Sequence, residues 1–579
     1  MSALLTPWGE ALDREHPLPE YPRPQLKRDS YVNLNGVWKC AFTETPLQPS
    51  HFDREIVVPF APESALSGVG RQLQCGEYLW YTRPVTLPEG FVRGRVLLHF
   101  GAVDQIAEVL WNGVHAARHE GGYLPFSVDI TDFLCAGENT LTVRVQDSLT
   151  DTPHAYGKQR YKRGGIWYTA TSGIWQTVWL ESVPENHIES LELKPDFSER
   201  CLRWRVRARD ALNVRLAVCM DGEVILRSFV DGDGGVCRVP DEYFRPWTPE
   251  DPFLYTVRVE MGEDRVESYF AFRSFGTVER YGRRVLALNG KPYFQNGLLD
   301  QGYWSDGLYT APADEAMIYD IQTAKRLGFN MLRKHIKIEP ARWYYHCDRL
   351  GMIVWQDMVN GGGRYDPVVI TAPLFTGKHL DDERYRLFGR ADARGRRQFL
   401  SDMAETVRTL AHFPCIAVWT IFNEGWGQFD ALCAAEELRA LDPTRLIDHA
   451  SGWHDQGGGD LKSYHVYFRS LQMNVRHDGR RALALTEFGG YALPIPKHAP
   501  DKKFGYRSFR AAPDWQKAYV NLYERQVLPL IRAEALSAAV YTQLSDVEDE
   551  VNGLLTFDRR VCKAEERVFR ALNAKIKFM

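Results

Sequence analysis

Hydrophobic and polar residues alternate in three different patterns along the chain, and each pattern predicts a different domain. From residue 1 to 184, short alternating or apolar segments are separated by turn residues, which predicts a β-sandwich of the jelly-roll kind. Its predicted strands are 36–42, 78–85, 95–100, 106–111, 140–145 and 175–180. Residues 185–275 repeat this pattern in a smaller unit, which predicts an immunoglobulin-like sandwich with strands at 187–193, 202–207, 215–220, 223–230 and 254–260.

From residue 276 to 579, apolar strand-like segments alternate with helical patterns, which is typical of a parallel sheet with crossover helices. The eight predicted strands are 293–298, 329–332, 352–355, 415–422, 445–448, 463–466, 482–486 and 538–543. The segment 313–327 predicts a helix, with Pro312 near its start and Gly328 as its stop. Eight such units in about 300 residues predict a (β/α)8 TIM barrel. The long loop at 357–393 is expected to lie over its mouth.

The segment 416–422 is apolar or threonine throughout, with no alternation, and is followed by Asn423 and Glu424. An unbroken apolar run predicts a strand that is buried on both faces, as in a parallel sheet. In a TIM barrel, catalytic residues stand at the carboxyl ends of the strands. Asn423 and Glu424 are therefore candidates for chemistry, although a helix-capping Glu beside a turn Asn would fit the same letters.

Polar residues follow the other predicted strands as well, and the barrel topology would bring them to one mouth. They are Asp300, Gln301, Arg333, Lys334, His335, Asp357, Trp453, His465, Tyr467, Glu487, Gln543 and Asp546. Glu424 and Glu487 differ from the rest because each follows an apolar strand and precedes a glycine-bearing loop. Two carboxyl groups across a barrel mouth are what glycosidic cleavage requires. Their separation, which sequence spacing cannot supply, decides between retention and inversion.

Composition and charge narrow the classes of binding partner that the sequence predicts. A net charge of −4 with both signs mixed predicts neither nucleic-acid binding nor a membrane surface. The chain shows neither a signal peptide nor a segment of transmembrane length, and its ten cysteines lack C-x-x-C spacing. We therefore expect a cytoplasmic protein with reduced cysteines (Cys40, Cys219 and Cys415 lie in apolar runs), without a metal site or a cofactor. Aromatic residues reach 12%, which suits either sugar platforms or a β-rich core.

Several short motifs occur in an order that resembles glycoside hydrolase family 2, the β-galactosidase and β-glucuronidase family. They are Tyr21-Pro22-Arg23-Pro24, Leu34-Asn35-Gly36-Val37-Trp38, Ser172-Gly173-Ile174-Trp175, Phe272-Arg273-Ser274-Phe275-Gly276, Leu288-Asn289-Gly290-Lys291-Pro292, Trp419-Thr420-Ile421-Phe422-Asn423-Glu424 and Thr486-Glu487-Phe488-Gly489. Each motif alone is weak, but together they cover nearly the whole chain in family order.

The resemblance implies roles for the residues at the mouth. Glu424 would be the acid/base, Glu487 the nucleophile, and Asn423 a hydrogen-bond donor to the sugar 2-hydroxyl. Tyr467 and Arg333 would hold the nucleophile ionised, although Arg333 could instead pair with Asp357. His465, His335, Asp300, Gln301, Trp453 and Gln543 complete the expected substrate-binding set, with core packing as the alternative for His335 and Trp453.

The sugar is left open by departures from the family pattern. The expected histidine is displaced, because the sequence there reads Arg333-Lys334-His335, and the usual acidic pair is replaced by Trp355-Gln356-Asp357. The magnesium or sodium ion of the long galactosidases is therefore not expected. The segment 164–168 lacks the aspartate that galactosidases send into the site and offers aromatics instead. The N-x-K letters of glucuronidases occur at 289–291 and 573–575, where neither should reach the site.

A galactose-configured substrate is preferred on this basis: a β-galactoside, an α-L-arabinopyranoside or a β-galactofuranoside. A β-glucuronide, a β-galacturonide or a β-mannoside remains the alternative. A catalytically silent carbohydrate-binding protein would share the scaffold, but it would have no need for both Glu424 and Glu487. A homo-oligomer is compatible with the sequence.

Overall fold

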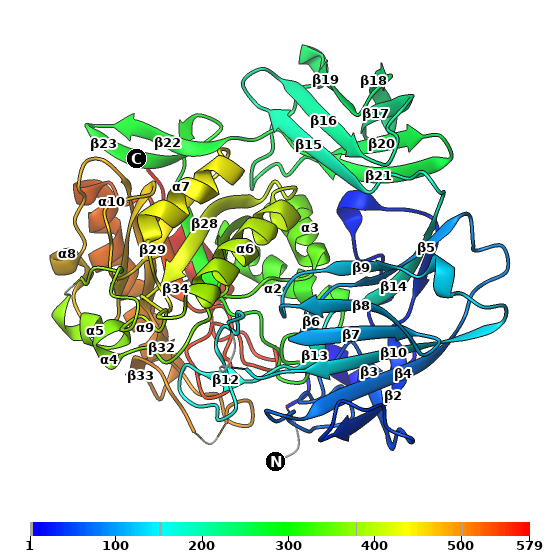
Figure 1. Ribbon diagram of the computed structural model, residues 1–579. Coiled ribbons are helices and arrows are strands. Elements are labelled where there is room, and N and C mark those ends of the chain that lie inside the picture. Colours follow the sequence, from blue (N-terminus) through cyan, green and yellow to red (C-terminus); the bar gives the residue numbers. More distant parts are fainter. Residues whose placement is uncertain (1–3, 150–152, 378, 501, 579) are drawn as a thin grey trace.

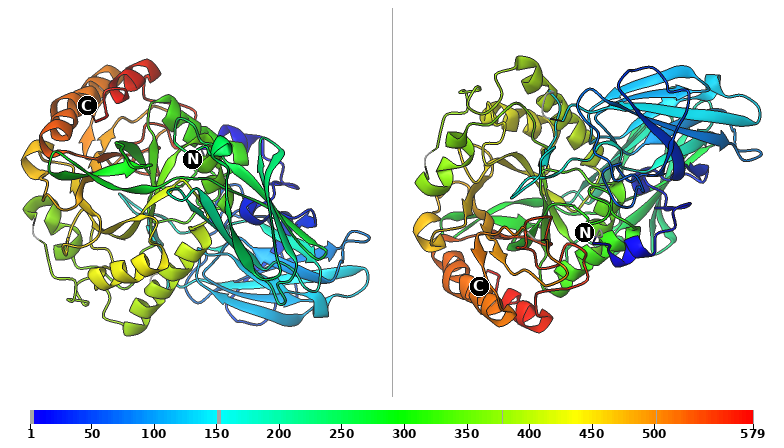
Figure 2. Two further views of the ribbon diagram at one scale, coloured as in Figure 1. Left: turned by 90° about the horizontal axis from the view of Figure 1, so that it is seen from above. Right: turned by 90° about the horizontal axis from the view of Figure 1, so that it is seen from below.

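The computed structural model describes residues 4–149, 153–377, 379–500 and 502–578. Figure 1 shows the chain running from a large β-sandwich through a smaller one into a barrel. In Figure 2 the barrel forms a ring, and both sandwiches lie along one side of it. The three predicted architectures are therefore present in the predicted order.

The first sandwich packs a four-stranded sheet against a six-stranded sheet, and the strands of both are antiparallel. The four-stranded sheet has the order β1 (Tyr31–Asn33), β14 (Val178–Val183), β5 (Arg95–Phe100) and β9 (Phe126–Asp129). The six-stranded sheet has the order β3 (Arg54–Val58), β2 (Gly36–Thr43), β4 (Tyr78–Thr86), β10 (Glu138–Gln146), β7 (Ile106–Trp111) and β8 (Val114–Glu120). The sequence missed β8 because its side chains are exposed or half-buried and show no apolar alternation.

Smaller elements complete this region. They are the helices α1 (Pro7–Glu10), η1 (Pro24–Leu26) and η2 (Thr131–Phe133), and the two-residue strands β6 (Val103–Asp104), β11 (Gln159–Arg160), β12 (Tyr168–Thr169) and β13 (Gly173–Ile174). Strands β11 and β12 pair in parallel and shape a loop that leaves the sandwich toward the barrel. This loop becomes part of the candidate site.

The second sandwich has a three-stranded and a four-stranded antiparallel sheet. Their orders are β15 (Ser190–Asp196), β16 (Cys201–Arg207), β19 (Gly234–Arg238), and β18 (Glu223–Val230), β17 (Val214–Met220), β20 (Tyr255–Met261), β21 (Asp264–Phe270). A short helix, η3 (Asp241–Tyr243), and a three-stranded sheet of β22 (Phe275–Arg280), β23 (Arg283–Leu288) and β24 (Lys291–Pro292) lead into the barrel. Boundaries at 184 and 275 stay predictions, and they fall at the edges of these sheets.

Eight parallel strands form the barrel, and each of the eight predicted runs overlaps one of them. Their spatial order is β29 (Leu446–Ser451), β28 (Ile416–Asn423), β27 (Ile353–Asp357), β26 (Met331–Lys334), β25 (Gln295–Asp300), β34 (Ala538–Thr542), β31 (Ala482–Gly489) and β30 (Leu461–Val466). The first and last strands of this order are joined by side-chain bonds, since Ser463 Oγ lies 2.9 Å from Asp448 Oδ1. All eight residues of β28 are buried, as the unbroken apolar run predicts.

Helices and short strands surround the barrel. They are α2 (Asp314–Arg326), α3 (Ala341–Leu350), α4 (Pro367–Ile370), α5 (Ala372–Thr376), α6 (Ala393–Leu410), α7 (Ala431–Leu441), α8 (Leu471–Asn474), α9 (Ala512–Leu522), η4 (Tyr523–Val527), α10 (Leu528–Glu534), α11 (Glu566–Asn573), β32 (Tyr491–Ala492) and β33 (Arg507–Ser508). The predicted helix at 313–327 is α2, which ends before Gly328 at φ +90°. The loop at 357–393 contains α4 and α5, which the sequence did not predict.

Two further expectations concern the cysteines and membrane-spanning segments. All ten cysteines are free, and six of them, including Cys40, Cys219 and Cys415, are buried. Among the residues with a described placement, no helix is both long and apolar enough to cross a membrane.

Candidate active site

Glu424 and Glu487 lie at the carboxyl ends of strands β28 and β31, where the sequence placed them. Glu424 has a left-handed backbone at φ +52°, and its N–H donates to the Ser451 carbonyl at 3.0 Å. The next residue, Gly425, also has a positive φ, and a Cβ there would lie 2.6 Å from the His454 ring. This tight turn lets β28 end abruptly with Glu424 at the barrel mouth.

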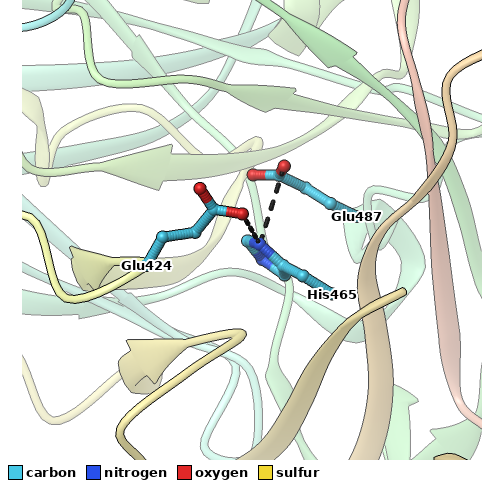
Figure 3. A group of neighbouring side chains, drawn as sticks. All are labelled: Glu424, His465 and Glu487. Carbon is cyan, nitrogen blue, oxygen red and sulfur yellow. Dashed lines mark hydrogen bonds and ion pairs between the residues drawn. The ribbon is translucent and has the colours of Figure 1, made fainter. Parts of the chain in front are cut away.

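The two carboxyl groups converge on the same nitrogen of the His465 imidazole (Figure 3). One oxygen of Glu424 and one of Glu487 lie within 4.8 Å of each other. His465 Nδ1 is 2.8 Å from Glu424 Oε1 and 3.6 Å from Glu487 Oε2. The sequence placed His465 among substrate-binding residues, whereas the structure shows that it bridges the two carboxyl groups.

The His465 ring is held in one tautomer. Burial lowers its pKa to about 4, so the ring is neutral at pH 7. Nε2 lies 3.4 Å from Arg333 Nη1 and 3.2 Å from Ser451 Oγ. Because a guanidinium can only donate, Nε2 accepts and Nδ1 carries the proton. That N–H therefore donates to Glu424.

Glu487 is surrounded by groups that stabilise its charge. Arg333 Nη1 donates to its Oε1 at 3.2 Å, and the Tyr467 hydroxyl donates to its Oε2 at 2.5 Å. Burial raises the pKa of Glu487 above its ordinary value of 4.5, while His465, Arg333 and Tyr467 oppose that rise. Glu487 is thus the better stabilised anion of the pair.

Glu424 is in the opposite situation. Among the described residues, no guanidinium or hydroxyl is bonded to its carboxyl group, and burial raises its pKa to about 7, against the attraction of Lys158 and Arg333. Only 7% of the residue is exposed. A carboxyl group with this pKa carries its proton near neutral pH and can donate it.

Arg333 connects Glu487 to Asp357 and Asn423. It makes two bonds of 3.0 Å to Asp357 and one of 2.8 Å from Nη2 to Asn423 Oδ1. Burial opposes its charge, but Asp357 and Glu487 outweigh that cost and raise its pKa. The two sequence-based readings of Arg333 are therefore compatible, because it binds both Asp357 and Glu487. Asn423 Nδ2 is buried and has no partner among the described residues, so it is free to donate to a ligand.

The remaining predicted residues divide into two groups. His335 and Trp453 stand beside the carboxyl pair: His335 Nδ1 bonds Asp357 at 2.9 Å, and the Trp453 ring is centred 6.3 Å from the His465 ring. Asp300, Gln301 and Gln543 are engaged by protein partners instead.

Both carboxylate oxygens of Asp300 are occupied, one by Lys334 Nζ at 2.7 Å and one by the Gly302 N–H at 2.9 Å. Gln301 Nε2 donates to Gln543 Oε1 at 2.8 Å. Contact of these three side chains with substrate stays a prediction, and for Asp300 the geometry indicates a structural role.

Sequence reasoning missed the cationic contribution of the first sandwich. The loop between β11 and β12 brings Trp167 against Trp426, with ring centroids 4.9 Å apart. Lys158, the residue before β11, lies beside both Tyr168 and Trp426. The aromatic residues of this loop could be noticed in the sequence, whereas nothing in the sequence marked Lys158 as a residue of the site. Tyr506, which stacks on Tyr467 at 3.6 Å, was also missed because it lies in a loop far from any predicted strand.

Glu424, His465 and Glu487 are the only group of three acidic, histidine or cysteine side chains close enough to share a metal ion in the part of the chain that the structure describes. Their atoms are already paired with one another or with Arg333 and Tyr467. The arrangement suits proton transfer and attack on carbon, because it supplies one protonated and one ionised carboxyl group.

Comparison with known proteins agrees with this geometry. Residues 72–184 match the profile of the glycosyl hydrolases family 2 sugar binding domain, and residues 282–492 match the profile of the family 2 TIM barrel domain. A β-galactosidase of Thermoanaerobacter pseudethanolicus is 21% identical over 480 residues, which are 75% of this chain and 59% of that protein. The β-glucuronidase of Felis catus is 24% identical over 493 residues, which are 74% of this chain and 69% of that protein. The chain thus spans less than two thirds of the bacterial β-galactosidase.

Solved structures share the fold over the whole chain. A β-D-glucuronidase from Dictyoglomus thermophilum superposes with a TM-score of 0.74 at 18% identity, covering 96% of this chain and 99% of that one. A β-galacturonidase from Eisenbergiella tayi bound to galacturonate superposes with a TM-score of 0.70 at 18% identity, covering 96% and 100%. Since the two family profiles together match more than half of the residues, the chain belongs to glycosyl hydrolases family 2.

Proposed function

We propose that the protein is a retaining, exo-acting glycoside hydrolase that removes a terminal sugar through a glycosyl–enzyme intermediate. The observation that carries this proposal is the pairing of Glu424 and Glu487, with oxygens within 4.8 Å of each other and unequal stabilisation of their charges. Retaining enzymes separate their carboxyl groups by about 5–5.5 Å and inverting enzymes by about 6.5–9.5 Å. The short separation supports the retaining mechanism.

In the first step, a Glu487 oxygen attacks the anomeric carbon while the bond to the leaving oxygen breaks. Glu424 gives its proton to that oxygen. Asn423 Nδ2 donates to the sugar 2-hydroxyl, a contact that strengthens as positive charge develops on the ring. Arg333 and Tyr467 hold Glu487 in place for the attack.

In the second step, Glu424 is a carboxylate and takes a proton from water. The water oxygen attacks the anomeric carbon, and the bond to Glu487 breaks with its electrons returning to the carboxylate. Loss of the Glu487 charge in the intermediate removes one reason for Glu424 to stay protonated, so its pKa falls when a base is needed. The hydrogen bond from His465 stabilises Glu424 in this ionised form.

The class of sugar that the enzyme removes is also part of the proposal. The relatives include proteins named β-galactosidase and β-glucuronidase. We therefore propose a β-linked sugar that is either galactose-configured or a uronic acid, with a β-mannoside as a further candidate.

The test is a panel of aryl glycosides that covers β-galactoside, β-galactofuranoside, β-glucuronide, β-galacturonide, β-mannoside and α-L-arabinopyranoside, assayed with wild type and Glu487→Ala. We expect at least one glycoside to be hydrolysed by the wild type alone, with the product first released in the same anomeric configuration by NMR. A 2-deoxy-2-fluoro analogue of that sugar should add its mass to a peptide containing Glu487. Release of the opposite anomer would contradict the mechanism, and oligosaccharide binding without hydrolysis would favour a catalytically silent carbohydrate-binding protein.

A further inference from the structure

Lys158 is a nearly buried cation at the barrel mouth, and it has no counter-ion among the residues that the structure describes. Only 6% of the residue is exposed. In the described parts of the chain, no carboxylate oxygen lies within 4.0 Å of its ammonium group. Its Nζ instead lies 5.3 Å from the centre of the Tyr168 ring and 5.7 Å from that of Trp426. A charge removed from water usually has a partner, and two aromatic faces replace only part of its hydration.

The ammonium group faces the catalytic carboxyl groups. Lys158 is the largest charge that opposes the rise in the pKa of Glu424, and it also contributes to lowering the pKa of His335. Trp426, which it approaches, is two residues after Glu424 and is 6.4 Å from the His335 ring. The charge of Lys158 thus acts on Glu424, the group that must reach the leaving oxygen of a bound sugar.

Three other buried cations near the mouth are paired with carboxylates. Arg333 pairs with Asp357 and Glu487, Lys334 pairs with Asp300, and Lys337 pairs with Glu339. The two N-x-K segments are elsewhere: Lys575 pairs with Glu524 on the surface, and Lys291 lies exposed in β24. Unlike these three cations, Lys158 has no carboxylate oxygen within 4.0 Å in the described part of the chain.

The backbone around Lys158 is fixed from both sides. The N–H groups of Tyr156 and Gly157 each donate to the Asn360 carbonyl of the barrel at 3.0 Å. The fully buried Gln159 donates to Asp104 Oδ2 at 3.0 Å and to the Tyr123 hydroxyl at 2.9 Å. A residue held this way presents its charge without further ordering, which is how binding groups gain affinity.

One acidic group, Glu550, stands near this position and is itself engaged. Its Oε2 accepts from the Tyr168 hydroxyl, and its Oε1 accepts from Asn552 Nδ2 at 3.3 Å. Burial raises the pKa of Glu424 to about 7, so this group is uncharged at lower pH, and Glu487 is paired with Arg333. None of these three carboxyl groups forms an ion pair with Lys158, so its ammonium group can pair with an anionic substrate.

We propose that Lys158, supplied by the N-terminal sandwich, binds the carboxylate of a uronic acid substrate and selects uronides over neutral glycosides. The inference rests on the proposed glycosidase function and narrows its substrate class. Glucuronides and galacturonides share the carboxylate and differ at C4, so both are used as probes.

The experiment measures kcat/KM for p-nitrophenyl β-D-glucuronide and β-D-galacturonide, and for the neutral β-D-glucoside and β-D-galactoside. Each variant is assayed at its own pH optimum, so that the effect of Lys158 on the pKa of Glu424 does not enter the comparison. Lys158→Met removes the charge at similar length, Lys158→Arg keeps it, and Lys162→Met in the same loop is the matched exposed control. Thermal unfolding of every variant reports on folding.

We expect the wild type to prefer one of the uronides. Lys158→Met should lower kcat/KM for that uronide by about 100-fold, because an unsatisfied substrate carboxylate is costly in a desolvated site. Lys158→Arg should retain part of the activity, and neutral glycosides should change by less than about 3-fold. Equal losses on charged and neutral sugars would overturn the inference, as would a wild type that hydrolyses only neutral glycosides. Absence of hydrolysis on every probe and on the wider panel would instead contradict the proposed function.

Discussion

The raised pKa of Glu424 has a measurable effect on stability. The group keeps its proton in the folded protein up to a pKa of about 7, whereas in the unfolded chain it loses that proton near its ordinary pKa of 4.5. Between these two values the folded state binds a proton that the unfolded state has lost. Stability therefore falls as pH rises from about 4.5 to 7 and stays low above that range. Glutamine at this position would be neutral at every pH and would avoid the loss.

The magnitude follows from the same pKa values. One pKa unit is worth about 1.36 kcal/mol, so the rise from 4.5 to about 7 corresponds to at most about 3 kcal/mol in the free energy of unfolding. The barrel has about 300 residues and an unfolding entropy of about 0.6 kcal/mol per kelvin. Glu424→Gln should therefore raise the melting temperature of the barrel by up to about 5 °C at pH 8 and by almost nothing at pH 4.5.

The assay is differential scanning calorimetry of wild type and Glu424→Gln at pH 4.5, 6 and 8, with the barrel transition compared within each pH. The exposed residue Glu437 provides a control, since Glu437→Gln should give no pH-dependent gain. The reasoning would be refuted if Glu424→Gln were less stable than the wild type at pH 8, or if its gain were the same at all three pH values. A gain that grows with pH would also identify Glu424 as a residue kept for function at a cost in stability.

Five further outcomes are expected. Values of kcat/KM should fall above pH 7 as free Glu424 loses its proton, and at low pH as Glu487 becomes protonated through a pKa raised above 4.5; a profile without the basic limb would contradict the acid role. Glu487→Ala should reduce turnover by about 10⁴-fold or more with unchanged thermal unfolding, and wild-type rates would reject the nucleophile. Glu424→Gln should spare the first step for good leaving groups and accumulate a glycosyl–enzyme by mass spectrometry, whereas equal losses on all leaving groups would argue against it. Tyr467→Phe should lower kcat by about 10-fold or more, because it loses the hydrogen bond to Glu487; an unchanged kcat would remove the role assigned to Tyr467. Asp300→Ala should cost about 3 kcal/mol of stability, because it leaves Lys334 short of one partner; unchanged stability would remove the role assigned to Asp300.

Much of the barrel was predictable from local patterns. Strands such as β28 and β34 are nearly continuous apolar runs because all their residues are buried, and the amino-acid order records that directly. Glu424 and Glu487 were predictable for a related reason: parallel strands end at one edge, so a polar residue after an apolar run must face the mouth. Edge strands such as β8 left weaker signals because their side chains are largely exposed.

The partners of the site residues were decided by tertiary structure alone. The sequence could not show that His465 lies between the two carboxyl groups, that Asp300 is taken up by Lys334, or that Lys158 crosses from another domain. Periodicity reports which face of a strand or helix is buried, but the sequence separation of two residues does not determine their distance once loops fold back. The sequence by itself therefore determined the family and the three architectures, and it predicted Glu424 and Glu487 as the candidate catalytic pair. The pKa difference within that pair and the free cation beside it arise only when distant segments are desolvated together, because burial and neighbouring charge set both.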